Sequence, residues 1–236
     1  IFPEQLKAFY THYFPTEDFI NWLSYEGVVE NAKNYLQRRE FSLTIKEAYI
    51  RFKSVSSAEE FVSSILNKSP DKLDIGAVYT LPPCDKEKVA VGKFVPQEKE
   101  LVFDIDLTDY DDVRFCGCKE TQVCRECWQF AGCAMLVLEE LLENIFGSNN
   151  RIWIFSGRRG VHCWVCDASF RKLSLEARGQ IADFISVYLG GDKNKFKKLS
   201  LNTVATHPSF DVNSAIFKIC EQYFVKLFIE KWDILE

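Results

Sequence analysis

The sequence lacks the features that would place it in a membrane or direct it to secretion. No apolar run approaches 18 residues, and its first residues are not a charged segment followed by an apolar one. Neither a transmembrane helix nor a signal peptide is therefore predicted. Internal repeats and low-complexity segments are also missing. Because the first residue is Ile1 and not Met, we expect the chain to start inside a longer protein.

An excess of positive charge is absent as well. The 236 residues carry a formal net charge of −5, which argues against broad, nonspecific wrapping of nucleic acid. An enzyme that meets nucleic acid through a local basic surface remains compatible with this charge. Hydrophobic residues make up 47% of the chain and include 20 Phe, 9 Tyr and 5 Trp, so we expect a substantial core and not a disordered protein.

The most informative stretch is ELVFDID at residues 100–106. As a β-strand it would direct its three odd-numbered apolar residues to one face and Asp104 and Asp106 to the other, about 6–7 Å apart along the backbone. Carboxylates at this spacing can lean onto two cations about 3.5–4 Å apart, the arrangement used for in-line phosphoryl transfer. Because D-x-D is a short and common pattern, an edge strand with two solvated aspartates is an equal alternative on this motif alone.

Four of the nine cysteines lie within twelve residues, as Cys116, Cys118, Cys124 and Cys127. Two close pairs across a short loop can present four thiolates tetrahedrally, which is typical of structural zinc in a reducing compartment. The first pair is tighter than usual, and a set of core cysteines without metal is the alternative. Ordinary buried thiols are predicted for the five isolated cysteines, which are Cys84, Cys133, Cys163, Cys166 and Cys220.

Two predicted strands, residues 151–155 and 161–165, are joined by the short connection Ser156-Gly157-Arg158-Arg159-Gly160. Its glycines predict a hairpin, whose turn would present one hydroxyl and two guanidinium groups beside His162 on the returning strand. Arginine forks match phosphate oxygens, and glycines let backbone N–H groups approach closely. The group therefore predicts a polyphosphate site. Taken singly, a core histidine and a solvated turn are the alternatives.

Hydrophobic periodicity predicts helices and strands along the rest of the chain. The segments with helical periodicity are 1–40, with a break at Pro15, then 58–67 and 128–144, and those with strand character are 41–52 and 74–79. By itself, the run Arg38-Arg39-Glu40 predicts a surface ion-pair cluster. The acidic run at 109–112 could support the site, but by default it predicts a solvated loop.

Several of these segments together resemble one family. ELVFDIDLTDYDDVR, the cysteine cluster ending in C-x-x-C-W, and SGRRGVHCWV are similar to the catalytic (small) subunit of the archaeo-eukaryotic DNA primases, in its eukaryotic form. RREFSLTIKEAYIR and DIGAVY stand in the same order, and the resemblance runs from about residue 5 to the end of the chain. It implies an α/β fold with mixed central β-sheets flanked by helices. Residues 1–236 would form one catalytic domain, with a small zinc-binding module at 116–127.

The resemblance also implies an activity and its residues. A primase joins ribonucleotides on a DNA template: a 3′-hydroxyl attacks the α-phosphate of the incoming triphosphate, and pyrophosphate leaves. Asp104 and Asp106 match the family's catalytic pair and would hold Mg²⁺ or Mn²⁺. The positions that match triphosphate contacts are Ser156, Arg158, Arg159 and His162. Asp74 matches a residue near the sugar hydroxyls, and Glu40 and Arg51 match less sharply defined residues around the nucleotide.

Cofactors and partners follow from the same resemblance. The structural Zn²⁺ would be held by Cys116, Cys118, Cys124 and Cys127, although the family often has adjacent cysteines where Gly117 separates the first two here. The implied partners are a primase large subunit with an iron–sulfur cluster, the replicative DNA polymerase that extends the primer, a single-stranded DNA template and ribonucleoside triphosphates. The implied location is the nucleus, with no membrane association.

One departure from the family and two alternative functions remain. The family has a third metal-binding carboxylate in a later segment, whereas here Asp211 and Asp233 lie in helical or loop contexts. We therefore expect residues 1–236 to be a fragment that binds nucleotide weakly and polymerises poorly. The first alternative is a primase-like repair polymerase that extends existing primers. The second is a non-catalytic zinc-bearing scaffold that binds nucleotides or a partner.

Overall fold

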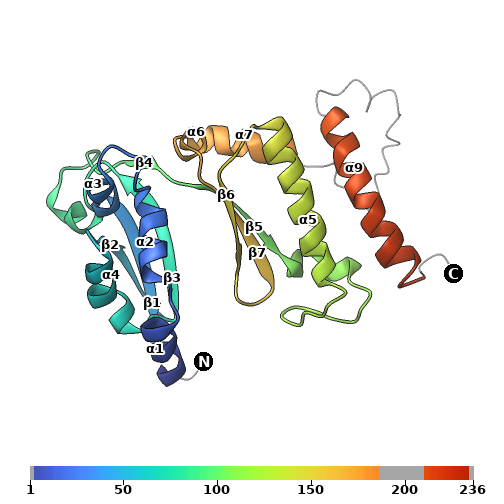
Figure 1. Cartoon of the computed structure of the whole chain (residues 1–236), viewed down its shortest axis with the longest axis horizontal. Helices are drawn as coiled ribbons and strands as arrows, with labels where there is room; N and C mark the ends of the chain where they lie inside the picture. The colour runs from blue at the N-terminus through green and yellow to red at the C-terminus, as the bar shows by residue number, and fades with distance from the viewer. Residues whose placement is uncertain (1–2, 186–209, 234–236) are drawn as a thin grey trace. The chain divides into compact units, whose positions relative to one another are not determined.

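The computed structural model describes residues 3–185 and 210–233. The chain forms two compact units, one up to Lys99 and one from Glu100 onward, and each has its own sheet and helices (Figure 1). The mixed α/β class expected from the sequence is confirmed. Within these residues, no helix combines the length and the apolar character needed to cross a membrane.

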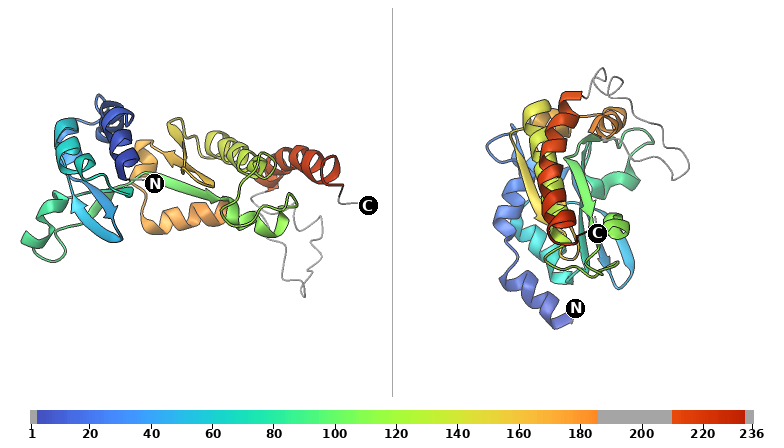
Figure 2. Two further views of the ribbon diagram at one scale, coloured as in Figure 1. Left: turned by 90° about the horizontal axis from the view of Figure 1, so that it is seen from below. Right: turned by 90° about the vertical axis from the view of Figure 1, so that its right-hand side faces the viewer.

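The first unit is a four-stranded antiparallel sheet with helices on one face (Figures 1 and 2). Its strands, in the order β2-β1-β3-β4, are β1 (Arg39–Ile45), β2 (Ala48–Lys53), β3 (Lys72–Tyr79) and β4 (Pro96–Glu98). Its helices are α1 (Pro3–His12), α2 (Thr16–Ser24), α3 (Ala32–Gln37) and α4 (Ala58–Ser64), with 3-10 turns at η1 (Leu66–Lys68) and η2 (Pro83–Lys88).

Apolar side chains on alternate positions bind this sheet to its helices. Phe41 on β1 is fully buried, and its ring lies 5.2 Å from the ring of Phe61 on α4. The helix begins at Ser57, whose hydroxyl accepts a hydrogen bond from the backbone N–H of Glu60 at 3.2 Å, as expected for an N-cap serine. Because side chains alternate along a strand, the neighbours of Phe41 on β1 are directed to the opposite face, away from the helices.

The second unit contains a three-stranded antiparallel sheet in the order β5-β7-β6. The strands are β5 (Leu101–Asp106), β6 (Arg151–Phe155) and β7 (Gly160–Val165), and the 3-10 helix η3 (Leu107–Val113) follows β5. The helices are α5 (Trp128–Glu140), α6 (Ala168–Arg171), α7 (Leu175–Ile185) and α9 (Phe210–Phe224); α5 continues into the π-turn η4 (Leu141–Ile145) and α9 into η5 (Val225–Ile229). Helix α9 packs beside α5 (Figure 1).

The predicted alternation along β5 is confirmed. Leu101 and its odd-numbered neighbours pack with Leu138 of α5, Leu142 of η4, and Cys163 and Val165 of β7. Asp104 and Asp106 therefore lie on the other face of the same strand, where they are exposed or half-buried. An antiparallel sheet with one covered and one open face can carry polar chemistry on the open side.

Two local predictions about charged residues are wrong. Arg39 and Glu40 are 0% and 2% exposed. The buried guanidinium of Arg39 is satisfied because it donates hydrogen bonds to Leu23 O and Gly76 O at 3.2 Å each. The acidic run at 109–112 forms most of η3 and is not a loop. Asp111 within it is paired with the buried side chain of Arg114.

The prediction for the isolated cysteines is only partly right. Cys163 and Cys166 are buried as predicted, whereas Cys84 is exposed. Cys133 on α5 and Cys220 on α9 are half-buried and are not isolated in space. Both line an apolar cavity of about 410 Å³ between the two helices, and burial, together with the Cys220 thiol, raises the pKa of Cys133 to about 12.

Gly160 permits the close approach of β7 to β5, and replacing it tests the sheet. A Cβ atom at Gly160 would lie 2.4 Å from the carbonyl oxygen of Ile105, whereas one at Gly179 on α7 would meet nothing within 4 Å. We expect Gly160→Ala to lower the free energy of unfolding by about 1–3 kcal/mol because the strands must separate. Gly179→Ala, the control, should raise it by about 0.4–1 kcal/mol. Chemical denaturation measures both, and equal midpoints for Gly160→Ala and the unmodified protein would contradict the close approach.

Candidate active site

The register between β5 and β7 sets which residues of β7 lie opposite the two aspartates. Asp104 lies across from His162, and Asp106 lies across from Gly160. The His162 Nε2 and Asp104 Oδ1 atoms are 3.3 Å apart, with 33% and 71% of the two side chains exposed. The Asp104 carboxylate is thus open to solvent, with an imidazole beside it.

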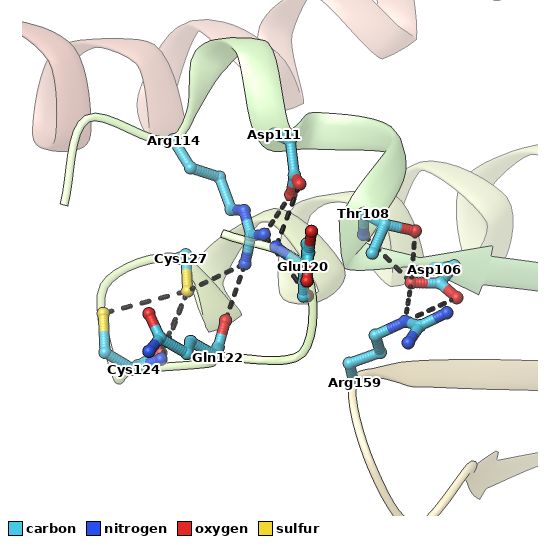
Figure 3. Close-up of polar contacts among 9 residues, drawn as sticks. All are labelled: Asp106, Thr108, Asp111, Arg114, Glu120, Gln122, Cys124, Cys127 and Arg159. Carbon is cyan, nitrogen blue, oxygen red and sulfur yellow. Dashed lines mark hydrogen bonds and ion pairs between the residues drawn. The ribbon is translucent and has the colours of Figure 1, made fainter. Parts of the chain in front are cut away.

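Asp106 has more hydrogen-bond partners than Asp104, and Figure 3 shows them. The Nε of Arg159 donates to both carboxylate oxygens, at 2.8 and 2.9 Å. Asp106 also caps η3, because its Oδ1 accepts hydrogen bonds from the backbone N–H and the hydroxyl of Thr108, each at 2.9 Å. The hydrogen bond from Arg159 is the main reason that the pKa of Asp106 falls to about 2, so the group is a carboxylate at any physiological pH.

The two aspartates are chemically suited to divalent cations such as Mg²⁺ or Mn²⁺. Carboxylate oxygens are the ligands that these cations prefer, and both side chains lie on the open face of one strand. Among the described residues, His162 is the only one whose side chain lies within ion-pair distance of the Asp104 carboxylate, at 3.3 Å. The Arg159 guanidinium is hydrogen-bonded to both oxygens of Asp106. A cation can therefore bind Asp106 only if this guanidinium moves away.

The hairpin between β6 and β7 is confirmed, and its turn is closed from both sides. The Ser156 N–H donates to Gly160 O, and the Gly160 N–H donates to the Ser156 hydroxyl, each at 3.0 Å. The Ser156 hydroxyl keeps a hydrogen that it can donate. Ser156 and Arg158 are exposed, and Arg159 is partly exposed. This end of the sheet therefore brings Ser156, the arginines and Asp106 together, and the pair of Asp104 and His162 lies two residues further along the same strands.

Glu40 and Arg51 form a second polar cluster, in the first unit. The Arg51 Nε and Nη2 donate to the two Glu40 oxygens at 2.9 and 3.1 Å. The Tyr79 hydroxyl, the Ser42 hydroxyl and the backbone N–H of Phe52 donate to the same carboxylate at 3.0, 3.1 and 3.3 Å. Five donors thus hold one buried carboxylate, while 47% of the Arg51 side chain stays exposed.

The pKa values in this cluster follow from that arrangement. Burial would raise the pKa of Glu40, but the hydrogen bonds from Arg51, Tyr79 and the Phe52 N–H outweigh it and lower the pKa. Burial, followed by the charge of Glu40, raises the pKa of Tyr79 to about 12. Glu40 is therefore a charged anchor for Arg51.

Asp74 lies on β3 directly opposite Ser42 of β1 and is exposed. Because residues opposite each other share a face of the sheet, Asp74 lies on the same side as Ser42, whose hydroxyl contacts Glu40. Three sequence-predicted residues, Glu40, Arg51 and Asp74, thus gather on one sheet of the first unit. The two aspartates, Ser156, Arg158, Arg159 and His162 gather in the second.

The four clustered cysteines have the geometry of a zinc site. Their Sγ atoms all lie within 4.8 Å of one another, and the Cys124 and Cys127 sulfurs are 3.8 Å apart. A tetrahedral site with Zn–S bonds of about 2.3 Å places its sulfurs about 3.8 Å apart. Gly117 adopts φ +81°, which a glycine allows without strain, and so closes the tight first pair. The backbone N–H groups of Cys127 and Glu126 lower the pKa of the Cys124 thiol to about 7, whereas burial raises that of Cys118 to about 12. Cys124 is thus closer than Cys118 to the thiolate that zinc requires.

Sequence reasoning missed three residues that support these groups. Thr108 follows Asp106 with the spacing of an N-cap, and this signal could have been found in the D-L-T sequence. Tyr79 and Arg114 carry no such signal. Tyr79 meets Glu40 across 39 positions of sequence, and Arg114 reaches a carbonyl and a sulfur in the cysteine loop, so only the fold identifies their partners.

The ion pair of Asp106 predicts a dependence on pH. Its pKa of about 2 lies below the ordinary value of 3.8, so the pair stabilises the folded state above about pH 4 and is lost as the pH falls towards 2. For a partly exposed pair we expect about 1 kcal/mol or less. Carboxyl NMR titration should show Asp106 ionising near pH 2 in the unmodified protein and nearer 4 in Arg159→Met. Titration near 4 in both proteins would contradict the pair.

Comparison with known proteins assigns these residues to a family. A family model described as DNA primase small subunit matches residues 103–234. The DNA primase small subunit of Schizosaccharomyces pombe is 36% identical over 231 residues, which are 98% of this chain and 49% of that protein. That of Caenorhabditis elegans is 41% identical over 187 residues (79% of this chain and 44% of that protein), and that of Drosophila melanogaster is 36% identical over 236 residues (98% and 51%).

The chain spans about half the length of the curated relatives it matches. The matched segment carries the two aspartates, the four cysteines and the arginine hairpin, and the chain belongs to the DNA primase small subunit family.

Proposed function

We propose that this chain carries the catalytic site for DNA-directed synthesis of short RNA primers at the start of DNA replication. The observation that carries the proposal is the open face of β5 and β7, where two carboxylates lie beside an imidazole, a hydroxyl and arginine side chains. In this reaction a bond forms between a 3′ oxygen and the α-phosphorus of a ribonucleoside triphosphate. The bond from the α-phosphorus to the oxygen that bridges the α- and β-phosphates breaks. Pyrophosphate leaves, and the 3′-hydroxyl loses its proton.

The hairpin would receive the triphosphate. Arg158 is exposed and Arg159 is partly exposed, and guanidinium groups pair with phosphate oxygens in a bidentate way. The Ser156 hydroxyl would donate to a third phosphate position, and His162 would donate from the neighbouring strand. Arg159 would transfer from Asp106 to phosphate as the nucleotide enters, which also frees the Asp106 oxygens.

The carboxylates and the cysteines would hold different metals. Asp104 and Asp106 would hold Mg²⁺ or Mn²⁺, which when bound favours ionisation of the attacking hydroxyl and neutralises charge on the leaving pyrophosphate. Cys116, Cys118, Cys124 and Cys127 would hold a structural Zn²⁺ at the 116–127 module. The chemistry of each donor set supports the division, because hard oxygen ligands suit Mg²⁺ and thiolates suit zinc.

The first unit would contribute sugar and nucleotide contacts. Asp74 is exposed on β3 and can accept hydrogen bonds from ribose hydroxyls, which is a means of preferring ribonucleotides through the 2′-hydroxyl. Arg51 presents its exposed edge while Glu40 holds its other edge. In this proposal Glu40 is a positioning residue and does not touch the nucleotide.

The relatives are named as small subunits, which supports a complex. We propose that the partners are a primase large subunit carrying an iron–sulfur cluster and the replicative DNA polymerase that extends the primer. The template would be single-stranded DNA, and the place of action would be the nucleus.

Primer synthesis without a pre-existing primer tests the proposal. The complete gene product with its partner subunit, given ribonucleotides and a homopolymeric single-stranded DNA template, should make dinucleotides and short oligomers. Asp104→Asn and Asp106→Asn should lower the rate at least about 100-fold, because each weakens a metal contribution of several kcal/mol. Asp112→Asn, an exposed neighbour in η3, is the control and should keep the rate.

Each other outcome would replace the proposal. Products that form only when a primer is supplied would indicate a primase-like repair polymerase. The absence of products from every version, with zinc retained, would indicate a non-catalytic scaffold that binds nucleotides or a partner.

The anchoring of Arg51 predicts a pattern in the nucleotide KM. Glu40→Gln should raise the KM about 3- to 10-fold and change kcat little, because an unanchored Arg51 must be ordered when the nucleotide binds. Arg51→Ala should have a similar effect, and the double variant should add little to either. Glu47→Gln, an exposed glutamate after β1, is the control. Additive effects of Glu40→Gln and Arg51→Ala would show that the two residues act separately.

A further inference from the structure

We propose that Arg114 is a positioning residue that joins the cysteine loop to η3, the helix capped by Asp106. Zinc bound in the loop would then stiffen the carboxylate that, under the proposed function on which this inference rests, holds the catalytic cation. The cysteine module would have a role at the catalytic centre as well as a role in folding its own loop.

The contacts of Arg114 span both segments (Figure 3). From the cysteine loop, Gln122 O accepts from Nη1 at 2.9 Å, and the Sγ of Cys127 lies 3.9 Å from the same nitrogen. From η3, the carboxylate of Asp111 accepts from Nη2. The other oxygen of Asp111 accepts the backbone N–H of Glu120 in the loop at 3.0 Å. Both residues of the Arg114–Asp111 ion pair therefore also hydrogen-bond to the cysteine loop, and the pair holds the loop against η3.

Burial makes this pair sensitive to its surroundings. The Arg114 side chain is 0% exposed, and Asp111, its carboxylate partner, is 30% exposed. The buried Nε of Arg114 has no hydrogen-bond partner within the described ranges. A buried cation with an unpaired donor is costly unless negative charge lies close by. Four thiolates around a divalent ion carry a net charge of about −2, and Cys127, one of those four, touches the guanidinium.

The helix η3 connects this pair to Asp106 within a few residues. Asp106 is the N-cap of η3, and its Oδ1 accepts the Thr108 N–H at 2.9 Å. Leu107, the first residue of η3, is 0% exposed and packs with Ala131 and Val161. Its N–H donates to Arg159 O at 3.1 Å. A short helix fixed at its start by Asp106 and near its end by Asp111 cannot shift at one end without disturbing the other.

Groups around a metal ligand tune both the metal and its neighbours. Hydrogen-bond donors behind the ligands typically change metal affinity about 10–100-fold when they are removed. Arg114 is such a donor to Cys127, and at the same time it holds Asp111 of η3. We therefore expect loss of Arg114 to loosen both the zinc and the start of η3.

The test uses the complete gene product with its partner subunit and two matched pairs of variants. Arg114→Met removes the guanidinium, and Arg125→Ala changes an exposed arginine of the same loop. Asp111→Asn removes the carboxylate on η3, and Asp112→Asn changes its exposed neighbour. Three quantities are measured: zinc release to a chelator, hydrogen–deuterium exchange of residues 106–113, and Mn²⁺ binding by electron paramagnetic resonance.

Arg114→Met should release zinc at least about 10-fold faster, exchange residues 106–113 at least 3-fold faster and bind Mn²⁺ about 3- to 10-fold more weakly. Asp111→Asn should give the same faster exchange and weaker Mn²⁺ binding. Removal of zinc from the unmodified protein should do so too. Exchange in α4 of the first unit should stay unchanged throughout, which a general loss of folding would not allow. Arg125→Ala and Asp112→Asn should match the unmodified protein.

The inference is overturned if residues 106–113 exchange at the unmodified rate in Arg114→Met, in Asp111→Asn and in the zinc-free protein. It is also overturned if exchange rises equally in α4. Failure of the proposed metal pair is a separate result: Mn²⁺ binding would then survive Asp104→Asn and Asp106→Asn. The exchange measurement needs no Mn²⁺, so it still decides whether Arg114 couples the loop to η3.

Discussion

The antiparallel register between β5 and β7 is the constraint on which the functional face depends. It places Asp104 opposite His162 and Asp106 opposite Gly160. A slip of one residue would turn both aspartates into the apolar layer under α5 and bring the odd-numbered residues of β5 to the surface. Burial of Leu101, Cys163 and Val165 therefore sets the position of the carboxylates, although none of these side chains takes part in chemistry.

Each polar cluster contains one arginine–carboxylate ion pair. Arg159 pairs with Asp106 in the second unit, and Arg51 pairs with Glu40 in the first. The two pairs differ in exposure, and this difference separates their roles. Glu40 is 2% exposed and is held by five donors, so it acts as a fixed anchor. The Arg159–Asp106 pair is about one-third exposed on each side, and under the proposed function it would open when a cation binds Asp106 and phosphate binds Arg159. Preorganised groups of the first kind and exchangeable groups of the second are both needed for binding a charged substrate.

The cysteine loop and β5 are linked by a very short stretch of chain. Asp106 ends β5, η3 follows at once, and Arg114 then directs its guanidinium into the loop of four cysteines. If residues 109–112 had formed a solvated loop, the cysteine loop and β5 would have been independent of each other. The 3-10 helix with a cap at Asp106 and an ion pair at Asp111 makes them neighbours in one small network (Figure 3).

The sequence by itself determined the elements whose signals are local. Alternation identified β5, the glycine-containing turn identified the hairpin, and the spacing of four cysteines predicted that their thiols gather in one loop. Strand period, turn and ligand spacing are properties of adjacent residues. The resemblance of short motifs to one family predicts that Asp104, Asp106 and the hairpin residues form one site. Tertiary structure decided what each charged residue meets. Arg39 and Glu40 are adjacent in sequence and were expected at the surface, yet both are buried, with partners on helix α2 (Leu23 O) and on strand β3 (Gly76 O and the Tyr79 hydroxyl). Charge alone does not reveal burial, since a buried charge is stable only where the fold brings partners to it.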